Sequence, residues 1–311
     1  MFRKHLSPKA TKTLATVLRW GGTLVSTTLF VWLISRQKWE IVIEKATGIA
    51  FWAIFLAPVL YLIAYGFNTL RWCALLWTQQ VKITYRQAFR LSWAASFASN
   101  FLPSTIGGDG FRMLAVYTYT DRKTISIGSV ILDRIINMTA MACLLPAPAL
   151  IFGTSLGKLF SGGMAAVPVG LQKLFERYFP KLVAALQTWA SRPWAFVYAF
   201  LAAWPSNLLP MSATYVLAHQ LGLSVTFWQV IGVQTVTYFL SLLPISVNGY
   251  GLREVAYTTL YVALGATLEQ ASTLALVTRF LMVLTTVPGA IWLSRALTGS
   301  VKLEDESGGQ F

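Results

Sequence analysis

The chain has 311 residues, of which 56% are hydrophobic and only 12% are charged, and its formal net charge at pH 7 is +14. This apolar content far exceeds that of a soluble domain, so composition predicts an all-α polytopic membrane protein. The lysines and arginines fall in short clusters between apolar stretches, where they orient the chain and meet anionic lipid. We therefore expect no nucleic-acid partner.

The N-terminal residues 1–12 are basic and contain no acid. The apolar residues 13–34 that follow are long enough to cross a hydrocarbon core of about 30 Å. A secretory signal peptide is the alternative, but no small-residue cleavage pattern follows. We expect a retained span with the N-terminus in the cytoplasm, followed by a polar link at residues 35–46.

The rest of the first half contains two further spans, at residues 47–70 and 124–153. Residues 88–102 are apolar but too short for a comfortable crossing. The adjacent charges Asp133 and Arg134 lie inside the last span. Neighbouring residues point to different sides of a helix, so each should find its own partner or face a cavity.

The second half repeats this plan with weaker signals. Residues 156–170 are short and glycine-rich, and residues 171–189 predict an amphipathic helix at the lipid interface. Residues 193–217 are expected to be a span interrupted by Pro205 and Pro210. Residues 225–243 lead into a second polar break, residues 268–293 form the last span, and a polar tail follows.

A glycine-rich break stands at residues 101–112, within apolar sequence. It contains a proline, three glycines and two opposite charges, which break helices and are costly in lipid. The pattern recurs 141 positions later, with four identical pairs: Pro103/Pro244, Gly108/Gly249, Gly110/Gly251 and Arg112/Arg253. This predicts two broken or re-entrant helices whose freed amides line a polar cavity. Ordinary loops with turn-forming residues are the alternative.

The two breaks divide the chain into membrane repeats at residues 1–153 and 154–311, within one membrane domain. We expect about six spanning helices plus two re-entrant hairpins. If residues 156–170 cross the membrane, three crossings separate the breaks and the repeats are inverted; otherwise they are parallel. The basic residues of the following link favour the inverted arrangement, which is typical of secondary transporters.

The two motifs together resemble the membrane domain of the lysylphosphatidylglycerol synthase/flippase family, in a stand-alone form. They read Leu-Pro-Ser-x-x-Gly-Gly-Asp-x-x-Arg at residues 102–112 and Leu-Pro-x-Ser-x-x-Gly-x-Gly-x-Arg-Glu at residues 243–254. The resemblance implies movement of a phospholipid between leaflets, a bacterial inner membrane and a possible homodimer. The soluble aminoacyl-transferase domain is missing from these residues, so the synthase activity is not expected. Asn248 replaces a glycine expected in the second motif.

Arginine presents a planar fork of donors that suits phosphate, which makes Arg112 and Arg253 the first expected head-group contacts. Arg134 and Arg279 are secondary, because each lies in the span after a break. The amides of the breaks would form an anion-binding nest; these residues are Gly107, Gly108, Gly110, Asn248, Gly249 and Gly251, with Pro103 and Pro244 as the helix breakers.

Asp109, Asp133 and Glu254 are the acids expected near these arginines. They could relay protons, bind a cationic head group or, as the alternative, form ion pairs that only hold the structure. Cys73 and Cys143 form no metal or disulfide motif, and no cofactor is expected.

A lipid translocase that is not an enzyme is therefore the leading prediction, moving an anionic or aminoacylated phospholipid. An integral-membrane transferase is the second class. It would need a carboxylate base or metal-binding acids, and the 11 acidic residues include no pair at a break. An accessory protein acting on lipid-linked substrates is the third.

Overall fold

The computed structural model describes residues 39–101, 106–120, 122–153, 189, 192–242 and 252–297. Within these ranges the regular structure is helical and contains no strand. The helices are α2 (Trp39–Thr47), α3 (Phe51–Thr78), α4 (Tyr85–Phe101), α5 (Ile106–Thr120), α6 (Lys123–Ala142), α9 (Trp194–Gln220), α10 (Phe227–Ser241), α11 (Leu252–Ala263), α12 (Leu268–Thr286) and α13 (Gly289–Leu297).

Several expectations fall outside the described residues and stay predictions. They concern the span at residues 13–34, the segment 156–170, nearly all of the predicted interfacial helix, most of the polar tail, and the break residues Pro103, Pro244, Asn248, Gly249 and Gly251.

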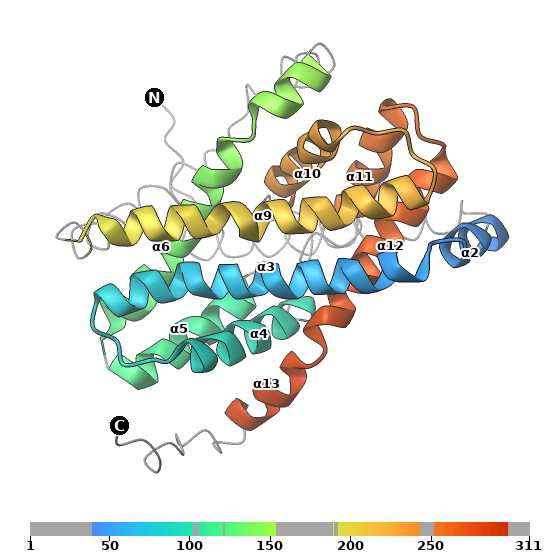
Figure 1. Cartoon of the computed structure of the whole chain (residues 1–311). Coiled ribbons are helices and arrows are strands. Elements are labelled where there is room, and N and C mark those ends of the chain that lie inside the picture. Colours follow the sequence, from blue (N-terminus) through green and yellow to red (C-terminus); the bar gives the residue numbers. More distant parts are fainter. Residues whose placement is uncertain are drawn as a thin grey trace, which may run out of the picture.

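The two long helices α3 and α9 lie side by side and run in opposite directions (Figure 1). The amide of Ala50, just before α3, donates to Gln220 Oε1 at the end of α9 at 3.3 Å. Further along, Arg71 of α3 donates to Ser206 Oγ of α9 at 3.3 Å. Residue numbers therefore rise along one helix as they fall along the other, and this antiparallel pair forms the middle of the fold.

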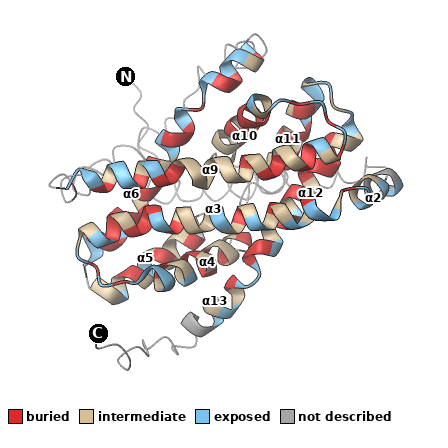
Figure 2. Ribbon diagram, viewed as in Figure 1, coloured by how far each residue is buried: buried red, intermediate tan, exposed pale blue. Residues whose placement is uncertain are grey.

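The extent to which side chains are buried differs between the two ends of α3 (Figure 2). Its first half buries one side only, at Ala53, Ala57, Tyr61 and Ala64, which matches helical periodicity. Large apolar side chains such as Phe51, Phe55 and Val59 are exposed on the other side. By length and composition α3 and α6 could each cross a membrane, and they are the two described helices that meet this criterion. The exposed face of α3 suits lipid better than water.

Three helices begin with the same local signal, a Thr-x-x-Gln capping box. Thr84 before α4, Thr226 before α10 and Thr267 before α12 each accept from the backbone N–H of the glutamine three positions later. Each glutamine side chain in turn accepts from the threonine's backbone N–H. These reciprocal bonds satisfy amides that a helix start otherwise leaves unpaired, so sequence fixes these boundaries.

The prediction that Pro205 and Pro210 interrupt the span at residues 193–217 was wrong, because α9 is continuous through both. Each proline removes one backbone hydrogen bond, but neighbouring polar side chains bond to carbonyls in the same region. Asn207 Nδ2 donates to the Ala203 carbonyl at 2.9 Å, and Thr214 Oγ1 donates to the Pro210 carbonyl at 3.1 Å.

Other boundaries also differ from the expected ones. The polar link at residues 35–46 overlaps helix α2, which begins at Trp39. The span expected at residues 124–153 is divided, because α6 ends at Ala142 and a turn at 143–145 precedes further helical residues. The span expected at residues 268–293 is divided by Pro288, which separates α12 from α13.

The hairpin of α4 and α5 packs unusually closely at Gly108. A Cβ atom placed there would lie 2.5 Å from the backbone oxygen of Ala95 and 2.1 Å from Ser99 Oγ, both on α4. The prediction that Gly107, Gly108 and Gly110 form the unwound break was therefore wrong, because α5 already begins at Ile106. Gly108 instead lets two helices approach each other.

The end of the chain packs against this hairpin. Trp93 Nε1 of α4 donates to the Thr285 carbonyl at 2.7 Å, and Asn100 Nδ2 donates to Thr286 Oγ1 at 2.8 Å. A Cβ at Gly289 would meet the backbone oxygen of Trp93 at 2.4 Å, so α13 also approaches α4 closely. These contacts join the second half of the chain to the first.

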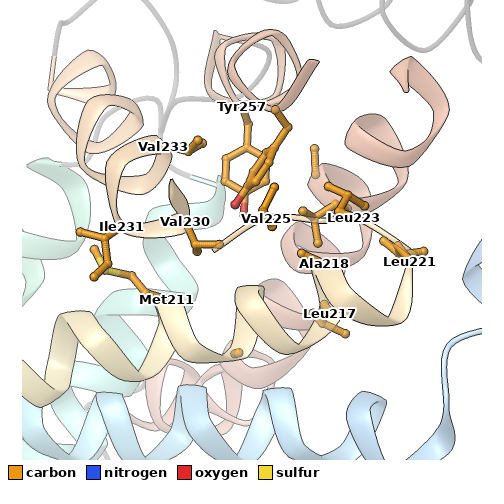
Figure 3. Close-up of a cluster of buried hydrophobic side chains, with 14 of the residues drawn as sticks. Met211, Leu217, Ala218, Leu221, Leu223, Val225, Val230, Ile231, Val233 and Tyr257 are labelled. Carbon is orange, nitrogen blue, oxygen red and sulfur yellow. The ribbon is translucent and has the colours of Figure 1, made fainter. Parts of the chain in front are cut away.

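Two apolar clusters form the core. One joins the ends of α3 and α9 to α10, α11 and α12, and Figure 3 shows Tyr257 reaching down among Val225, Val230 and Val233. The other surrounds Trp72 between α3, α4, α5, α6 and the start of α9. Polar side chains lie between the two clusters, and they form the site described below.

We predict that Gly108→Ala lowers the free energy of unfolding by about 1–3 kcal/mol, because the added methyl group overpacks the α4–α5 contact. Gly110→Ala is the matched control, since nothing lies within 4 Å of its added Cβ. It should leave stability unchanged or raise it by up to about 1 kcal/mol through helix propensity. Thermal unfolding of the purified protein in detergent measures both, and equal losses in the two variants would contradict the packing role of Gly108.

Candidate functional site

Asp133 of α6 is the centre of a buried ion-pair network. The residue is 1% exposed. Its Oδ1 accepts from Arg71 Nε at 2.7 Å and its Oδ2 accepts from Arg112 Nη1 at 3.0 Å. One carboxylate therefore joins α3, α5 and α6 and neutralises part of the charge of two guanidinium groups.

Arg71 uses its remaining donors on side chains from three helices. Its Nη1 donates to Asn137 Oδ1 at 2.6 Å and to Ser206 Oγ at 3.3 Å, and its Nη2 donates to Asn68 Oδ1 at 2.6 Å. The guanidinium is thus held in one orientation by α3, α6 and α9. Sequence reasoning misses this residue, because the span expected at residues 47–70 ends just before Arg71, whereas α3 continues to Thr78.

Arg112 is 8% exposed and lies over the ring of Trp72, with Cζ 4.1 Å from the ring centroid. Its Nη1 is also 4.0 Å from Asp109. Asp109 in turn forms an ion pair with Arg134, whose side chain is 39% exposed. The first half of the chain thus places four of the predicted site residues, Asp109, Arg112, Asp133 and Arg134, in one network with Arg71.

The second half holds a smaller charge cluster. Arg279 Nε of α12 lies 3.6 Å from Glu254 Oε1 of α11, and both side chains are largely buried. Arg253 lies beside this pair in sequence, and its Nη1 is 3.5 Å from Met282 Sδ. In the described part of the chain Arg253 has no carboxylate within ion-pair distance.

The two arginines that repeat in sequence are therefore not equivalent in space. Arg112 is paired with acids and stacked on an aromatic ring, whereas Arg253 has neither among the described residues. We had expected two matching phosphate contacts. Among the described residues, acids compensate the charge of Arg112 but not that of Arg253.

Two adjoining cavities lie between the charge clusters. One, of about 240 Å³, is lined by Tyr61, Ala64, Tyr65, Asn68, Arg71, Asn137, Ser206, Asn207, Pro210, Gln234, Arg253 and Met282. The other, of about 200 Å³, shares Ser206, Asn207, Pro210, Gln234, Arg253 and Met282 and adds Met141, Met211, Thr237, Tyr238, Ser241 and Arg279. Arg71 therefore faces the first cavity, Arg279 the second, and Arg253 both.

The polar groups of these cavities come from helices that are otherwise apolar. Asn207 Nδ2 donates to Asn137 Oδ1 at 3.0 Å, and Asn137 Nδ2 donates to the Tyr238 hydroxyl at 3.1 Å. Gln234 Nε2 donates to Thr214 Oγ1 at 2.8 Å. Such a chain of amides and hydroxyls inside a membrane domain is costly unless it serves a polar ligand or a water-filled path.

A larger cavity of about 570 Å³ lies elsewhere, between the far ends of α3 and α9, with Phe67, Leu70, Trp77 and Leu201 in its lining. Arg192 is its one charged lining residue, so it lacks the convergent polar groups of the central cavities. Among the described residues, no three His, Cys, Asp or Glu side chains are grouped to hold a metal ion.

The helical architecture, the apolar outer face and the buried polar interior together define an integral α-helical membrane protein. The family described as the lysylphosphatidylglycerol synthase TM region matches residues 19–289, most of the chain. The chain belongs to this family, as its two motifs indicated, and a membrane function related to lipid follows from that membership. No curated protein matches the chain.

We predict that Asp133→Asn lowers the free energy of unfolding by about 3–5 kcal/mol, because it leaves two buried guanidinium groups without their shared counter-charge. Glu44→Gln is the control, since Glu44 is exposed on α2, and it should change stability by no more than about 0.5 kcal/mol. Thermal unfolding in detergent tests the pair. A loss no larger than that of the control would show that the network contributes little to the fold.

Proposed function

We propose that the protein is a lipid translocase, without enzymatic activity, that moves a phosphate-bearing lipid between leaflets. The observation that carries this proposal is the position of Arg253, which faces two adjoining polar cavities and has no acidic partner among the described residues. An uncompensated arginine inside a membrane domain is costly, and a phosphate group would offset that cost through paired hydrogen bonds.

The cavities suit a head group better than a whole lipid. Each is smaller than the roughly 300–1,000 Å³ that encloses a drug-sized ligand. In the proposed mechanism Arg253 binds the phosphate, and the amides of Asn68, Asn207 and Gln234 replace the water that the head group loses. The acyl chains remain in the surrounding lipid, against exposed apolar faces such as that of α3.

Helix positions support an internal repeat with inverted halves. Adding 141 to the residue numbers of α3, α4, α5 and α6 gives positions close to those of α9, α10, α11 and α12, in the same order. The first members of the two sets, α3 and α9, lie antiparallel in Figure 1. In this proposal about six spans and two re-entrant hairpins open the central cavity to each leaflet in turn.

An integral-membrane transferase is the alternative class. It would need a free carboxylate or a metal site near the cavity. Asp109, Asp133 and Glu254 each lie in an ion pair with arginine instead. An accessory protein is a further alternative. We also propose a bacterial inner membrane and a homodimer, which rest on the family resemblance, and a cytoplasmic N-terminus, which rests on the basic N-terminal residues.

We predict that Arg253→Ala slows lipid translocation at least about tenfold, because it removes a charge-assisted contact to phosphate. The assay follows head-group-labelled phospholipid in proteoliposomes as it becomes accessible to a membrane-impermeant quencher. Arg86→Ala is the matched control, since Arg86 is exposed at the start of α4 and is not among the residues that line the two cavities. Wild-type exchange no faster than that of empty liposomes, for every phospholipid tried, would refute the translocase proposal.

The inverted repeat makes a separate prediction about the loops after α3 and α9. Lys82 and Ser224 are exposed, occupy nearly equivalent repeat positions and should lie on opposite sides of the membrane. Lys82→Cys and Ser224→Cys would be made singly in a chain with Cys73 and Cys143 replaced by alanine. An impermeant maleimide should label Lys82→Cys from the cytoplasmic side only and Ser224→Cys from the opposite side. Labelling of both from one side would establish parallel repeats.

A further inference from the structure

The two charge clusters beside the central cavities each contain more arginines than acids. Five arginines and three acids lie on the helices α3, α5, α6, α9, α10, α11 and α12. This count leaves out Lys123 and Glu269, which lie in the first turns of α6 and α12. Arg71, Arg112 and Arg134 share two acids, Asp109 and Asp133, in the first cluster. In the second cluster Glu254 pairs with Arg279, and Arg253 beside it has no carboxylate within ion-pair distance among the described residues. Each cluster therefore carries one positive charge in excess.

The lining of both cavities reinforces this imbalance. Three arginines, Arg71, Arg253 and Arg279, face the two cavities, and the described residues of both linings include no aspartate or glutamate. Glu254 reaches only a third space of about 10 Å³ beside Arg279, which is about enough for one water molecule. A ligand in the central cavities thus meets positive charge without a carboxylate to bind a cation.

Two of the neutral acceptors in the lining are already occupied. Asn68 Oδ1 and Asn137 Oδ1 both accept from Arg71, and Asn137 Oδ1 additionally accepts from Asn207. An ammonium group carries three donors and no acceptor, so it cannot accept from the arginines of the lining and is repelled by their charge. A phosphate group, by contrast, offers acceptor oxygens to Arg253 and brings the negative charge that both clusters lack.

We infer that the central cavities select a lipid whose head group has a net negative charge and reject one made cationic by aminoacylation. Arg253 makes the direct contact, and the excess charge of the Arg71 cluster adds an attractive field. The inference rests on the proposed function for its biological setting, since it names the class of lipid that the translocase would carry. It states that a lysylated lipid is not the lipid that this chain would carry.

Binding and movement are measured separately, so that the two proposals can fail separately. Thermal unfolding of the purified protein in non-ionic detergent is followed with short-chain phosphatidylglycerol, lysylphosphatidylglycerol or phosphatidylcholine, over a range of concentrations. We expect phosphatidylglycerol to stabilise the protein with an affinity about tenfold or more above that of the other two lipids. Arg253→Ala should lose this preference, and the control Arg86→Ala should keep it.

A second variant reverses the charge of the lining without removing an arginine. Gln234 faces both cavities, so Gln234→Glu places a carboxylate beside Arg253 and should weaken phosphatidylglycerol binding while strengthening lysylphosphatidylglycerol binding. Gln80→Glu, at an exposed position after α3, should leave both affinities unchanged.

Equal binding of the lysylated and unmodified lipids, or no binding of any lipid, would overturn the inference even if proteoliposomes exchange lipid. Selective binding of phosphatidylglycerol without exchange would uphold the inference and refute the translocase. Unchanged selectivity in Gln234→Glu would contradict the assignment of the site to these cavities.

Discussion

The structure depends most on the pairing of Asp133 with Arg71 and Arg112. Burying any one of these charges alone in a membrane domain would be prohibitive, so each helix that carries one needs the others in place. The carboxylate thereby fixes α5, which follows the first break, against the long helices α3 and α6. The apolar cluster around Trp72 packs on the same junction and keeps the ion pairs away from water.

The same pairing produces the functional asymmetry between the two halves. In the first half the arginine of the repeated motif is compensated by acids, and its role is to hold helices together. In the second half Arg253 is left facing the cavity, while the neighbouring Glu254 pairs with Arg279. The two arginines of the recurring motif thus differ in their surroundings, since one lies in ion pairs and the other faces the central cavities. The positions of the neighbouring acids account for this difference between Arg112 and Arg253.

Several features followed from local sequence because they depend on short-range chemistry. The Thr-x-x-Gln boxes at Thr84, Thr226 and Thr267 fix helix starts, since their reciprocal bonds involve only neighbouring residues. The class of membrane protein was predicted correctly from composition and the two motifs. Gly108 is different, because a glycine in this sequence context is typical of a break, whereas here it allows a close helix contact with Ala95 of α4.

Sequence by itself determined the all-helical membrane class, the family and the charged residues near the site other than Arg71. Composition and two motifs were enough for this, because apolar content and spacing are properties of the chain alone. Tertiary structure decided which charges meet. Arg71 is 62 positions from Asp133 and 135 from Ser206, and only the packing of α3 against α6 and α9 brings them together. Compensation of a buried charge depends on distance in space, and therefore only the fold could distinguish Arg112 from Arg253.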